Sequence, residues 1–224
     1  DTLDTTGLKL TATYNNGTTQ TITSGFTCTP TALTSAGTQT VTVNYGGKTA
    51  TFAVNVQDVT LSGIAIASNP TKTSYYVGDT LDTTGLKLTA TYNNGTTQTI
   101  TSGFTCTPIA LSTAGVQTVT VNYGGKTATF TVSVQDVTLS GIAIASNPTK
   151  TSYYVGDTLD TTGLKLTATY NNGTTQTITS GFTCTPTALT SAGTQTVTVN
   201  YGGKTATFAV NVQDVTLSGI AIAS

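Results

Sequence analysis

An internal repeat constrains the fold of this chain more than any other feature. The ten residues DTLDTTGLKL begin at Asp1, Asp79 and Asp157, so the repeat period is 78 residues. Self-similarity at a fixed period is typical of tandem arrays in which each copy is one structural unit. We therefore expect four segments. These are residues 1–60, a repeat that lacks its first strand; 61–138 and 139–216, two complete repeats; and 217–224, the first strand of a following repeat.

The composition of the chain narrows the range of functions. Only 8% of the residues are charged, the formal net charge is −1, and Arg, Glu, His, Met and Trp do not occur. The electrostatic footprint of nucleic-acid binding is therefore missing. Without His or Glu, no Ser-His-Asp or Cys-His catalytic arrangement and no histidine-based metal site can form. No apolar run reaches the roughly 18 residues of a membrane span. We predict no nucleic-acid partner, no membrane span, no cofactor and no enzymatic activity.

Alternating apolar and polar residues predict short β-strands in every repeat. In the middle repeat, residues 86–92 and residues 128–134 each place four apolar side chains on one face. Asn94-Gly95 between two alternating runs predicts a hairpin, and Asp82-Thr83-Thr84-Gly85 predicts a type I turn. About seven short strands per repeat, without helical periodicity, indicate an all-β fold. We expect tandem immunoglobulin-like antiparallel β-sandwiches of about seven strands each, arranged as a rod.

Differences between the copies agree with this assignment of faces. The first and third repeats are identical over their shared 60 residues, whereas the middle repeat differs at six positions. These are Ile109, Ser112, Thr113, Val116, Thr131 and Ser133, and none belongs to the predicted inward set. The residues between successive repeats, such as 135–138, include no Gly, Pro or Ser. This composition predicts a stiff connection instead of a flexible linker.

The segment LSGIAIAS occurs three times, at residues 61–68, 139–146 and 217–224. We predict that it forms the first strand of each repeat, with a bulge or bend at its glycine. Leu217, Ile220 and Ile222 are then the predicted filament or strand-donation contact, buried against a domain like the first one. That domain is either the next one in a continuous array or the first domain of another molecule.

The single cysteine of each repeat has two interpretations. Cys28, Cys106 and Cys184 occupy equivalent positions in successive repeats, too far apart to pair within the chain. A free buried thiol that acts as a small hydrophobic residue is the structural interpretation. Cross-linking between neighbouring rods is the functional one.

Three further features could mark a binding or modification site. Asp79, Asp82 and Asp136 are the acids of one unit and could offer oxygen ligands to calcium, although turn formation already explains Asp82. Tyr75-Tyr76 could stack on a sugar, but such a pair more often lies half in the core and half at an interface. Residues 94–96 match the N-glycosylation sequon, and a hairpin tip accounts for them equally well.

Several motifs in order resemble the group-three bacterial immunoglobulin-like domain. They are the opening Tyr76 to Asp79, the strand Gly85 to Tyr92, the hairpin end Gly95-Thr96 and the turn Tyr123 to Lys126. The resemblance covers all three units, although the first lacks the opening and each copy has a cysteine where an aliphatic residue is usual. It implies tandem modules in bacterial surface, cell-wall-associated or secreted proteins, acting as stalks, adhesin segments or parts of surface layers, without catalytic residues.

These observations lead to two functional hypotheses. The first is a structural extracellular rod or filament on a bacterial surface, whose partners are neighbouring copies of itself, head-to-tail or lateral, with strand donation between units as its sharper form. The alternative is a stalk for cell adhesion, or a weak glycan-binding module, that spaces a tip domain and meets cell-wall or host glycans. Both place the chain outside the cell, at the surface or secreted.

Overall fold

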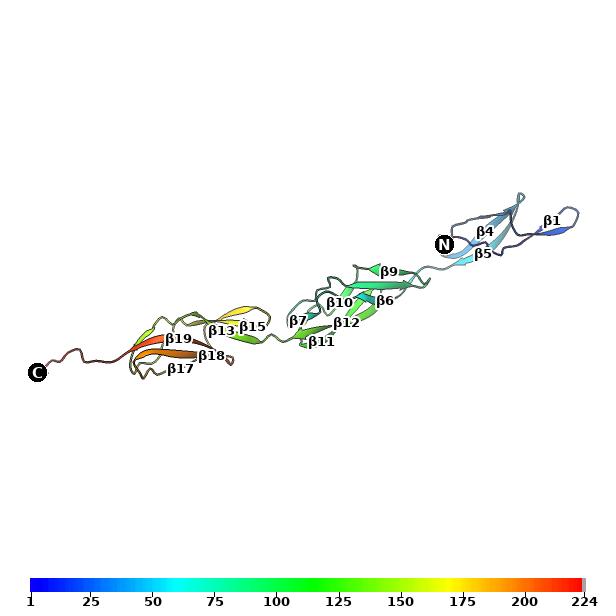
Figure 1. Cartoon of the computed structure of the whole chain (residues 1–224). Helices are drawn as coiled ribbons and strands as arrows, with labels where there is room; N and C mark the ends of the chain where they lie inside the picture. Colours follow the sequence, from blue (N-terminus) through cyan, green and yellow to red (C-terminus); the bar gives the residue numbers. More distant parts are fainter. Residues whose placement is uncertain (223–224) are drawn as a thin grey trace. The chain divides into compact units, whose positions relative to one another are not determined.

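The computed structural model describes residues 1–222 and consists of short β-strands joined by turns (Figure 1). It divides into two compact units, each made of separate stretches of chain. Unit 1 comprises Asp1–Ala67, Lys87–Phe104 and Asn122–Ala128, and unit 2 comprises Ser68–Leu86, Thr105–Val121 and Thr129–Ser224. The first repeat lies wholly in unit 1 and the third wholly in unit 2. In the described part of the chain, no helix has the length and apolarity needed to cross a membrane.

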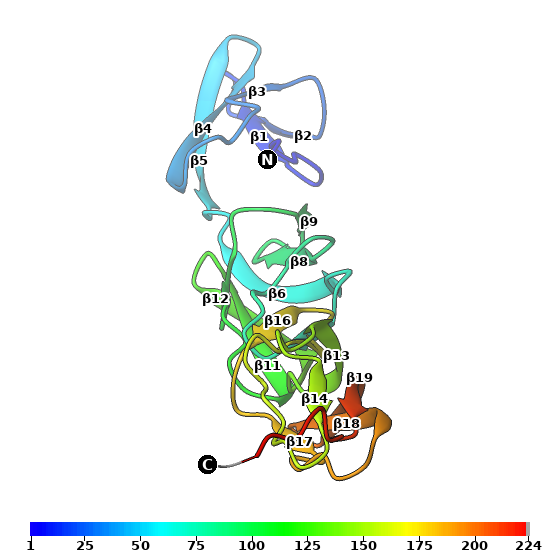
Figure 2. The same ribbon diagram turned by 90° about the vertical axis from the view of Figure 1, so that its left-hand side faces the viewer.

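The third repeat shows the complete fold, with seven strands in two sheets. The strands are β13 (Leu139–Ser146), β14 (Ser152–Tyr154), β15 (Lys165–Tyr170), β16 (Thr175–Ile178), β17 (Thr183–Thr185), β18 (Gly193–Tyr201) and β19 (Lys204–Gln213). One sheet has the order β13-β15-β16 and the other the order β14-β19-β18-β17. Figure 2 shows the chain turned by 90°, with β17, β18 and β19 labelled near the C-terminus. The predicted all-β immunoglobulin-like fold with about seven strands is confirmed. One detail of the prediction is wrong, because β14 pairs with β19 in parallel.

The core of the third repeat comes from the inward faces of both sheets. Its buried members are Tyr153, Leu164, Leu166, Ala168, Ile178, Leu189, Val197, Val199, Phe208, Val210 and Val212. Alternation along β18 and β19 buries every second residue, as the sequence pattern predicts. The Thr-rich outward positions on these strands are exposed. Each repeat also has one cis Thr–Pro bond, at Pro30, Pro108 and Pro186.

The middle repeat has the same strand inventory. Its strands are β6 (Leu61–Ser68), β7 (Ser74–Tyr76), β8 (Lys87–Tyr92), β9 (Thr97–Ile100), β10 (Thr105–Thr107), β11 (Gly115–Tyr123) and β12 (Lys126–Gln135). Their orders are β6-β8-β9 and β10-β11-β12-β7. All six positions at which this repeat differs from the others are exposed, so the predicted outward placement is confirmed.

The first repeat contains five strands. They are β1 (Leu10–Thr13), β2 (Thr19–Ile22), β3 (Thr27–Thr29), β4 (Gly37–Tyr45) and β5 (Lys48–Val56). They form a two-stranded sheet, β1-β2, and a three-stranded sheet, β3-β4-β5. Residues 1–60 therefore have no counterpart of β13 or β14, and one edge of each sheet is left unpaired.

Two turns differ in detail from the prediction. The hydrogen bond from Leu86 N to Thr83 O (3.0 Å) places the first turn one residue later than expected, with Gly85 third and at φ +87°. A positive φ at that position belongs to a type II turn. In the hairpin, Gly95 N bonds to Tyr92 O at 3.0 Å and only Gly95 has positive φ. The asparagines therefore do not adopt the left-handed conformation that a type I′ turn would require.

Candidate strand-acceptor site

Strand β1 of the first repeat is the equivalent of β15 in the third repeat. The edge of β15 pairs with β13, whereas the same edge of β1 has no partner strand in residues 1–222. In the third repeat, β13 pairs antiparallel with β15, and Ile142 lies opposite Ala168 while Ile144 lies opposite Leu166. Leu10 and Ala12 are the equivalents of Leu166 and Ala168 in the first repeat. Leu166 and Ala168 are fully buried, whereas Leu10 and Ala12 are only half-buried. The difference follows from the strand that covers one pair and not the other.

A groove of about 540 Å³ lies along this open edge. Its lining residues are Lys9, Leu10, Thr11, Ala12, Thr13, Tyr14, Val43, Tyr45, Gly46, Lys48, Thr49 and Ala50. They come from β1 and from the hairpin that joins β4 to β5, so both sheets contribute. The groove thus combines apolar side chains with the free backbone donors and acceptors of an edge strand, which is the combination that an added strand requires.

A glycine in the β4–β5 turn marks one end of the groove. In the third repeat, a Cβ atom at the equivalent Gly202 would lie 2.8 Å from Leu139 Cδ2, so the leucine of LSGIAIAS occupies the space above this glycine. In the middle repeat, a Cβ atom at Gly124 would lie 2.7 Å from Leu61 Cδ2. Gly46 in the first repeat has no atom within 4 Å of that position. Residues 1–60 do not include the leucine that lies beside this glycine in the other two repeats.

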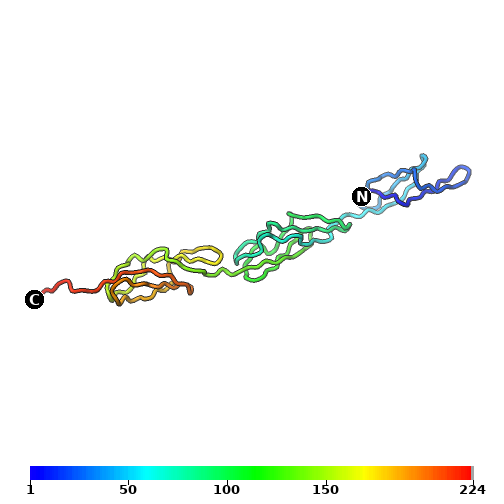
Figure 3. The backbone as a smooth tube through the Cα atoms, viewed as in Figure 1, coloured from blue at the N-terminus to red at the C-terminus, as the bar shows by residue number. Residues whose placement is uncertain are grey.

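The segment that would fit this groove follows β19. Leu217, Ile220 and Ile222 are 83%, 91% and 98% exposed, and no strand is assigned to them. They belong to the stretch after β19 that Figure 3 draws in red. The equivalent residues in β13, Leu139, Ile142 and Ile144, pack against the core of the third repeat. A register shift between Leu139 and Gly141 brings all three to one face, which confirms the predicted bulge at the glycine. Burial of Leu217, Ile220 and Ile222 against another domain stays a prediction.

A second vacancy in the first repeat corresponds to β14. The unpaired edge of β5 borders a hollow of about 270 Å³. Its lining residues are Asp1, Leu33, Asn55, Val56, Gln57, Asp58, Val59, Asn93 and Asn94. Residues 217–224 match β13 alone, so this segment can occupy the β1 edge while the β5 edge stays open.

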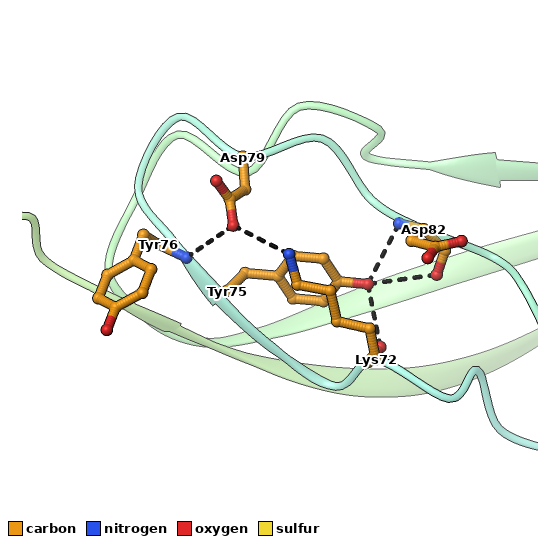
Figure 4. A network of polar contacts seen from close by, with 5 residues as sticks. All are labelled: Lys72, Tyr75, Tyr76, Asp79 and Asp82. Carbon is orange, nitrogen blue, oxygen red and sulfur yellow. Dashed lines mark hydrogen bonds and ion pairs between the residues drawn. The ribbon is translucent and has the colours of Figure 1, made fainter. Parts of the chain in front are cut away.

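The polar side chains between Lys72 and Asp82 form a network that stabilises a turn of the middle repeat (Figure 4). The Tyr75 hydroxyl donates to Lys72 O at 2.9 Å and accepts from Asp82 N at 3.1 Å. Asp79 Oδ2 accepts from Tyr76 N at 3.1 Å and pairs with Lys72 Nζ at 3.3 Å. The Tyr76 amide first, and the Lys72 ammonium second, lower the pKa of Asp79. All of these contacts join residues within 72–82, so they stabilise this turn.

This network bears on the calcium and sugar interpretations. Asp79 and Asp82 belong to it, and residues 1–222 contain no cluster of three or more acidic, Cys or His residues placed to hold a metal ion. Tyr75 is only 2% exposed, so its ring lies in the core and not on a sugar-binding surface. The Tyr76 hydroxyl donates a hydrogen bond to Asn171 O of the third repeat at 2.9 Å. The pair is therefore half core and half interface.

The three cysteines differ in burial, and the sequon residues bond to one another in the hairpin. Cys28, Cys106 and Cys184 are free thiols; Cys106 is buried and the other two are half-buried. Burial raises the pKa of the Cys106 and Cys184 thiols, which keeps them protonated and weakly reactive at neutral pH. In the hairpin, Asn94 Oδ1 accepts hydrogen bonds from Thr96 N at 3.0 Å and from Thr96 Oγ1 at 2.7 Å. The sequon residues thus stabilise the hairpin tip.

The other asparagine of the hairpin binds the linker, and sequence reasoning missed it. Asn171 N donates to Thr138 O at 3.0 Å, and Asn171 Oδ1 accepts from Thr138 N at 2.9 Å. Asn171 Nδ2 donates to Asp136 O at 2.9 Å. The sequence offers no signal for this role, because Asn171 and Asn172 are adjacent asparagines of one hairpin, and only Asn172 bonds to Thr174 within it.

The chain matches one family model and two characterised proteins in sequence. The model of the bacterial Ig-like domain (group 3) matches residues 1–56, 68–134 and 146–212. Pectate lyase L of Thermoclostridium stercorarium is 36% identical over 143 residues, which are 62% of this chain and 11% of that enzyme. Exo-beta-1,6-galactobiohydrolase of Bifidobacterium longum is 39% identical over 102 residues, 43% of this chain and 7% of the enzyme. The chain thus spans about a tenth or less of the length of these relatives.

Solved structures that are similar to parts of this chain include a surface layer protein and a fragment of titin. Domains 4–9 of the surface layer protein SbsC are 19% identical, with a TM-score of 0.29, over 92% of this chain and 42% of that one. The I-band fragment I67–I69 of titin is 9% identical, with a TM-score of 0.29, over 96% of this chain and 84% of that one. The family match covers each of the three repeats and most of the chain. The chain therefore belongs to the bacterial Ig-like domains of group 3.

Proposed function

We propose that this chain is part of a structural, extracellular rod or filament of a bacterium, built from Ig-like repeats and extended by strand donation. One observation carries the proposal. The first repeat has an open groove at β1, and the segment that fills the equivalent groove in the other repeats is also present, exposed, at residues 217–222. In the polypeptide of residues 1–224, the occupant is this segment of a second copy.

The proposed register follows from the β13–β15 pairing. Ile220 of one copy would lie opposite Ala12 of the next, and Ile222 opposite Leu10, as Ile142 and Ile144 lie opposite Ala168 and Leu166. Backbone hydrogen bonds to the free edge would supply affinity, and the three apolar side chains would supply the register. Burying one such side chain contributes about 1.5–3 kcal/mol, opposed by about 2–5 kcal/mol for ordering an extended segment.

Donation of this kind joins different surfaces of identical molecules. The donor segment follows the third repeat and the acceptor groove lies in the first, so each added copy presents a new free donor and a new free groove. A heterologous contact that does not close into a ring propagates as a fibre. This geometry suits a rod or filament with neighbouring copies as its partners.

The donor side is tested with the double variant Ile220→Asn/Ile222→Asn of the 1–224 polypeptide. We expect head-to-tail oligomers of the unmodified chain in sedimentation velocity and filaments in electron microscopy, and only monomers of the variant. Ala221→Asn is the matched control, because the equivalent Ala143 points to solvent. An unmodified chain that stays monomeric, or a double variant that still polymerises, contradicts the proposal.

The acceptor side has its own matched pair. Gly46→Ala places a methyl group where Leu217 would sit, whereas Gly47→Ala changes the next residue of the same turn, at a position with free space in every repeat. Both glycines have positive φ, so both variants carry similar backbone strain. We expect Gly46→Ala to weaken assembly well beyond Gly47→Ala. Equal effects would mean that Leu217 does not lie beside Gly46.

A second function is supported by the sequence relatives. Two enzymes named for action on carbohydrates match this chain over a small part of their length. In such an arrangement the repeats would form a non-catalytic stalk that spaces a tip domain, or would bind cell-wall or host glycans weakly. The coding sequence around these repeats distinguishes the two, because a distinct terminal domain favours the stalk and repeats throughout favour the fibre. A glycan array probed with the 1–224 polypeptide tests direct binding.

A further inference from the structure

The junction before the third repeat contains a contact that the junction before the middle repeat lacks. The Tyr76 hydroxyl donates a hydrogen bond to the carbonyl oxygen of Asn171 at 2.9 Å, across 95 residues of sequence. Asn171 also binds the linker through its backbone and its side chain. Asn171 thus accepts a hydrogen bond from Tyr76 of the preceding repeat and also bonds to the linker between the two repeats.

Strand pairing places Tyr76 beside the linker, and a hydrogen bond places Asn171 there as well. Tyr76 is the last residue of β7, and it lies opposite Gln135 in the parallel pair β12–β7. Gln135 directly precedes Asp136, whose carbonyl oxygen accepts from Asn171 Nδ2 at 2.9 Å. The linker is therefore bordered by the tyrosine strand on one side and by the asparagine hairpin on the other.

At the first junction the asparagine contact is present without the tyrosine. Asn93 N donates to Thr60 O at 3.0 Å, Thr60 N donates to Asn93 Oδ1 at 3.0 Å, and Asn93 Nδ2 donates to Asp58 O at 2.8 Å. Asn93 and Asp58 line the hollow of about 270 Å³ beside β5, the edge at which β7 and β14 pair in the other repeats. The position equivalent to Tyr76 at this junction would precede Asp1, so residues 1–222 show the asparagine contact alone.

We propose that Tyr76 and Asn171 form a latch that fixes the third repeat on its linker, and that Tyr154 presents the same surface to the asparagine hairpin of a further repeat. Tyr154 is the equivalent of Tyr76 and is 54% exposed, whereas Tyr76 is half-buried. The partner of this surface is an Asn-Asn-Gly hairpin of an identical repeat. The Tyr76–Asn171 contact lies within one chain, so this latch does not depend on strand donation.

The role of the latch is to limit hinge motion between repeats. Domains joined by a short linker move relative to one another unless specific contacts hold them. Four hydrogen bonds meet at Asn171, two from its side chain and two from its backbone, and together they tie the hairpin, the linker and the preceding repeat. Removal of the tyrosine hydroxyl deletes the bond to the preceding repeat. Removal of the asparagine side chain deletes two bonds to the linker and leaves the two backbone bonds in place.

Native cleavage by endoproteinase Asp-N tests the latch in the full chain. The enzyme cuts before aspartate, and intact mass separates a cut before Asp136 from a cut before Asp58. We expect the cut before Asp58 to be the faster one in the unmodified chain. Asn171→Ala should speed the cut before Asp136 about tenfold and Tyr76→Phe about threefold, as expected for the loss of two exposed hydrogen bonds and of one. The cut before Asp58 should not change.

Two controls separate the latch from a general loss of stability. Asn172→Ala removes the contacts that stabilise the hairpin tip and leaves the linker contacts of Asn171 in place. Tyr154→Phe makes the same chemical change as Tyr76→Phe at a position outside the two junctions. Both should leave cleavage before Asp136 unchanged, and Tyr76→Phe should leave thermal unfolding unchanged. Equal cleavage rates for Tyr76→Phe and the unmodified chain, or equal acceleration by Asn172→Ala and Asn171→Ala, would overturn the proposal.

Discussion

The first and third repeats share 60 identical residues but bury them to different extents. Leu166, Leu189, Phe208, Val210 and Val212 are buried in the third repeat, whereas their equivalents Leu10, Leu33, Phe52, Val54 and Val56 are only half-buried in the first. The side chains and the strands that carry them are the same. The difference comes from β13 and β14, which cover the third repeat and have no counterpart in residues 1–60.

This comparison separates the formation of strands from the closure of a core. Strands β4 and β5 pair in the same register as β18 and β19, so the long hairpin forms without the two covering strands. The hydrophobic stabilisation is roughly proportional to the apolar area removed from water, and it is therefore incomplete in the first repeat. The first repeat should be the least stable part of the chain and the one that gains most from a partner.

Supplying the missing strands should have the largest effect. We expect the segment LSGIAIASNPTKTSYYVG, added before Asp1, to raise the free energy of unfolding of the first repeat by about 5 kcal/mol, because it buries one leucine, two isoleucines and the tyrosine equivalent to Tyr153. Pulsed alkylation of Cys28 across a urea series measures this change. The same extension with threonine in place of those four residues is the control and should give little gain.

A mass difference is needed to measure the alkylation of Cys28 and of Cys184 separately. Their tryptic peptides have the same mass, so Ser35→Thr marks the first repeat; the middle repeat already has a threonine, Thr113, at this position. If Cys28 and Cys184 are alkylated at the same urea concentration before the extension is added, the difference in burial has no energetic consequence.

Truncation of one leucine in each repeat is the next test. Leu166→Ala should lower the stability of the third repeat by about 2–5 kcal/mol, as for a fully buried leucine. Leu10→Ala, the same change in the same sequence, should lower that of the first repeat by about 1 kcal/mol, because Leu10 still contacts water. Each substitution also changes the mass of its own tryptic peptide. Similar losses in both repeats would argue against an open β1 edge.

Removing a buried hydroxyl should have a smaller effect, confined to complete repeats. Tyr153→Phe deletes the hydrogen bonds of the hydroxyl with Lys150 O at 2.9 Å and with Asp160 N at 3.1 Å. We expect a loss of about 1–2 kcal/mol in the third repeat, measured by alkylation of Cys184 in urea. Cys28 serves as the internal reference and should not respond. A loss below the error of the measurement would show that water replaces these bonds at no cost.

Acid should produce the smallest effect. A hydrogen bond from the Tyr154 amide, and then one from Lys150, lower the pKa of Asp157, and bonds from Thr162 lower that of Asp160. A lowered pKa stabilises the fold above the unfolded value of about 3.9, and the stabilisation is lost as the pH falls through the folded pKa. The unfolding temperature, followed by circular dichroism, should therefore drop below about pH 4, and less so in Asp157→Asn. An identical pH profile for this variant would exclude Asp157 as a contributor.

The sequence predicted the fold well because its strands alternate strictly. The inward residues of β18 and β19 could be assigned by parity alone, and the bulge could be assigned from a glycine inside an apolar run. The turns were less predictable. The turn begins at Thr83, one residue later than expected. The Asp82 side chain accepts a hydrogen bond from Thr84 N at 2.9 Å, so Asp82 precedes the turn and stabilises it from outside.

The linker contacts illustrate why part of the site could not be predicted. Nothing in the local pattern of Asn171 distinguishes it from a turn residue, and its partners lie 33 and 35 residues earlier in the chain. Tyr76 lies 95 residues from the same asparagine. Such contacts depend on how complete domains meet, which hydrophobic periodicity does not encode.

The sequence by itself determined the repeat period, the all-β class, the inward faces and the identity of the segment that lies beyond β19. These are local or periodic properties, because side-chain direction in a strand alternates with period two. Only the tertiary structure decided that β14 runs parallel to β19, that identical repeats differ in burial, that Gly46 lines the groove beside β1, and that Asn171 binds the linker. Each of these depends on which strand covers which edge, and identical residues acquire different environments when that neighbour is present or missing.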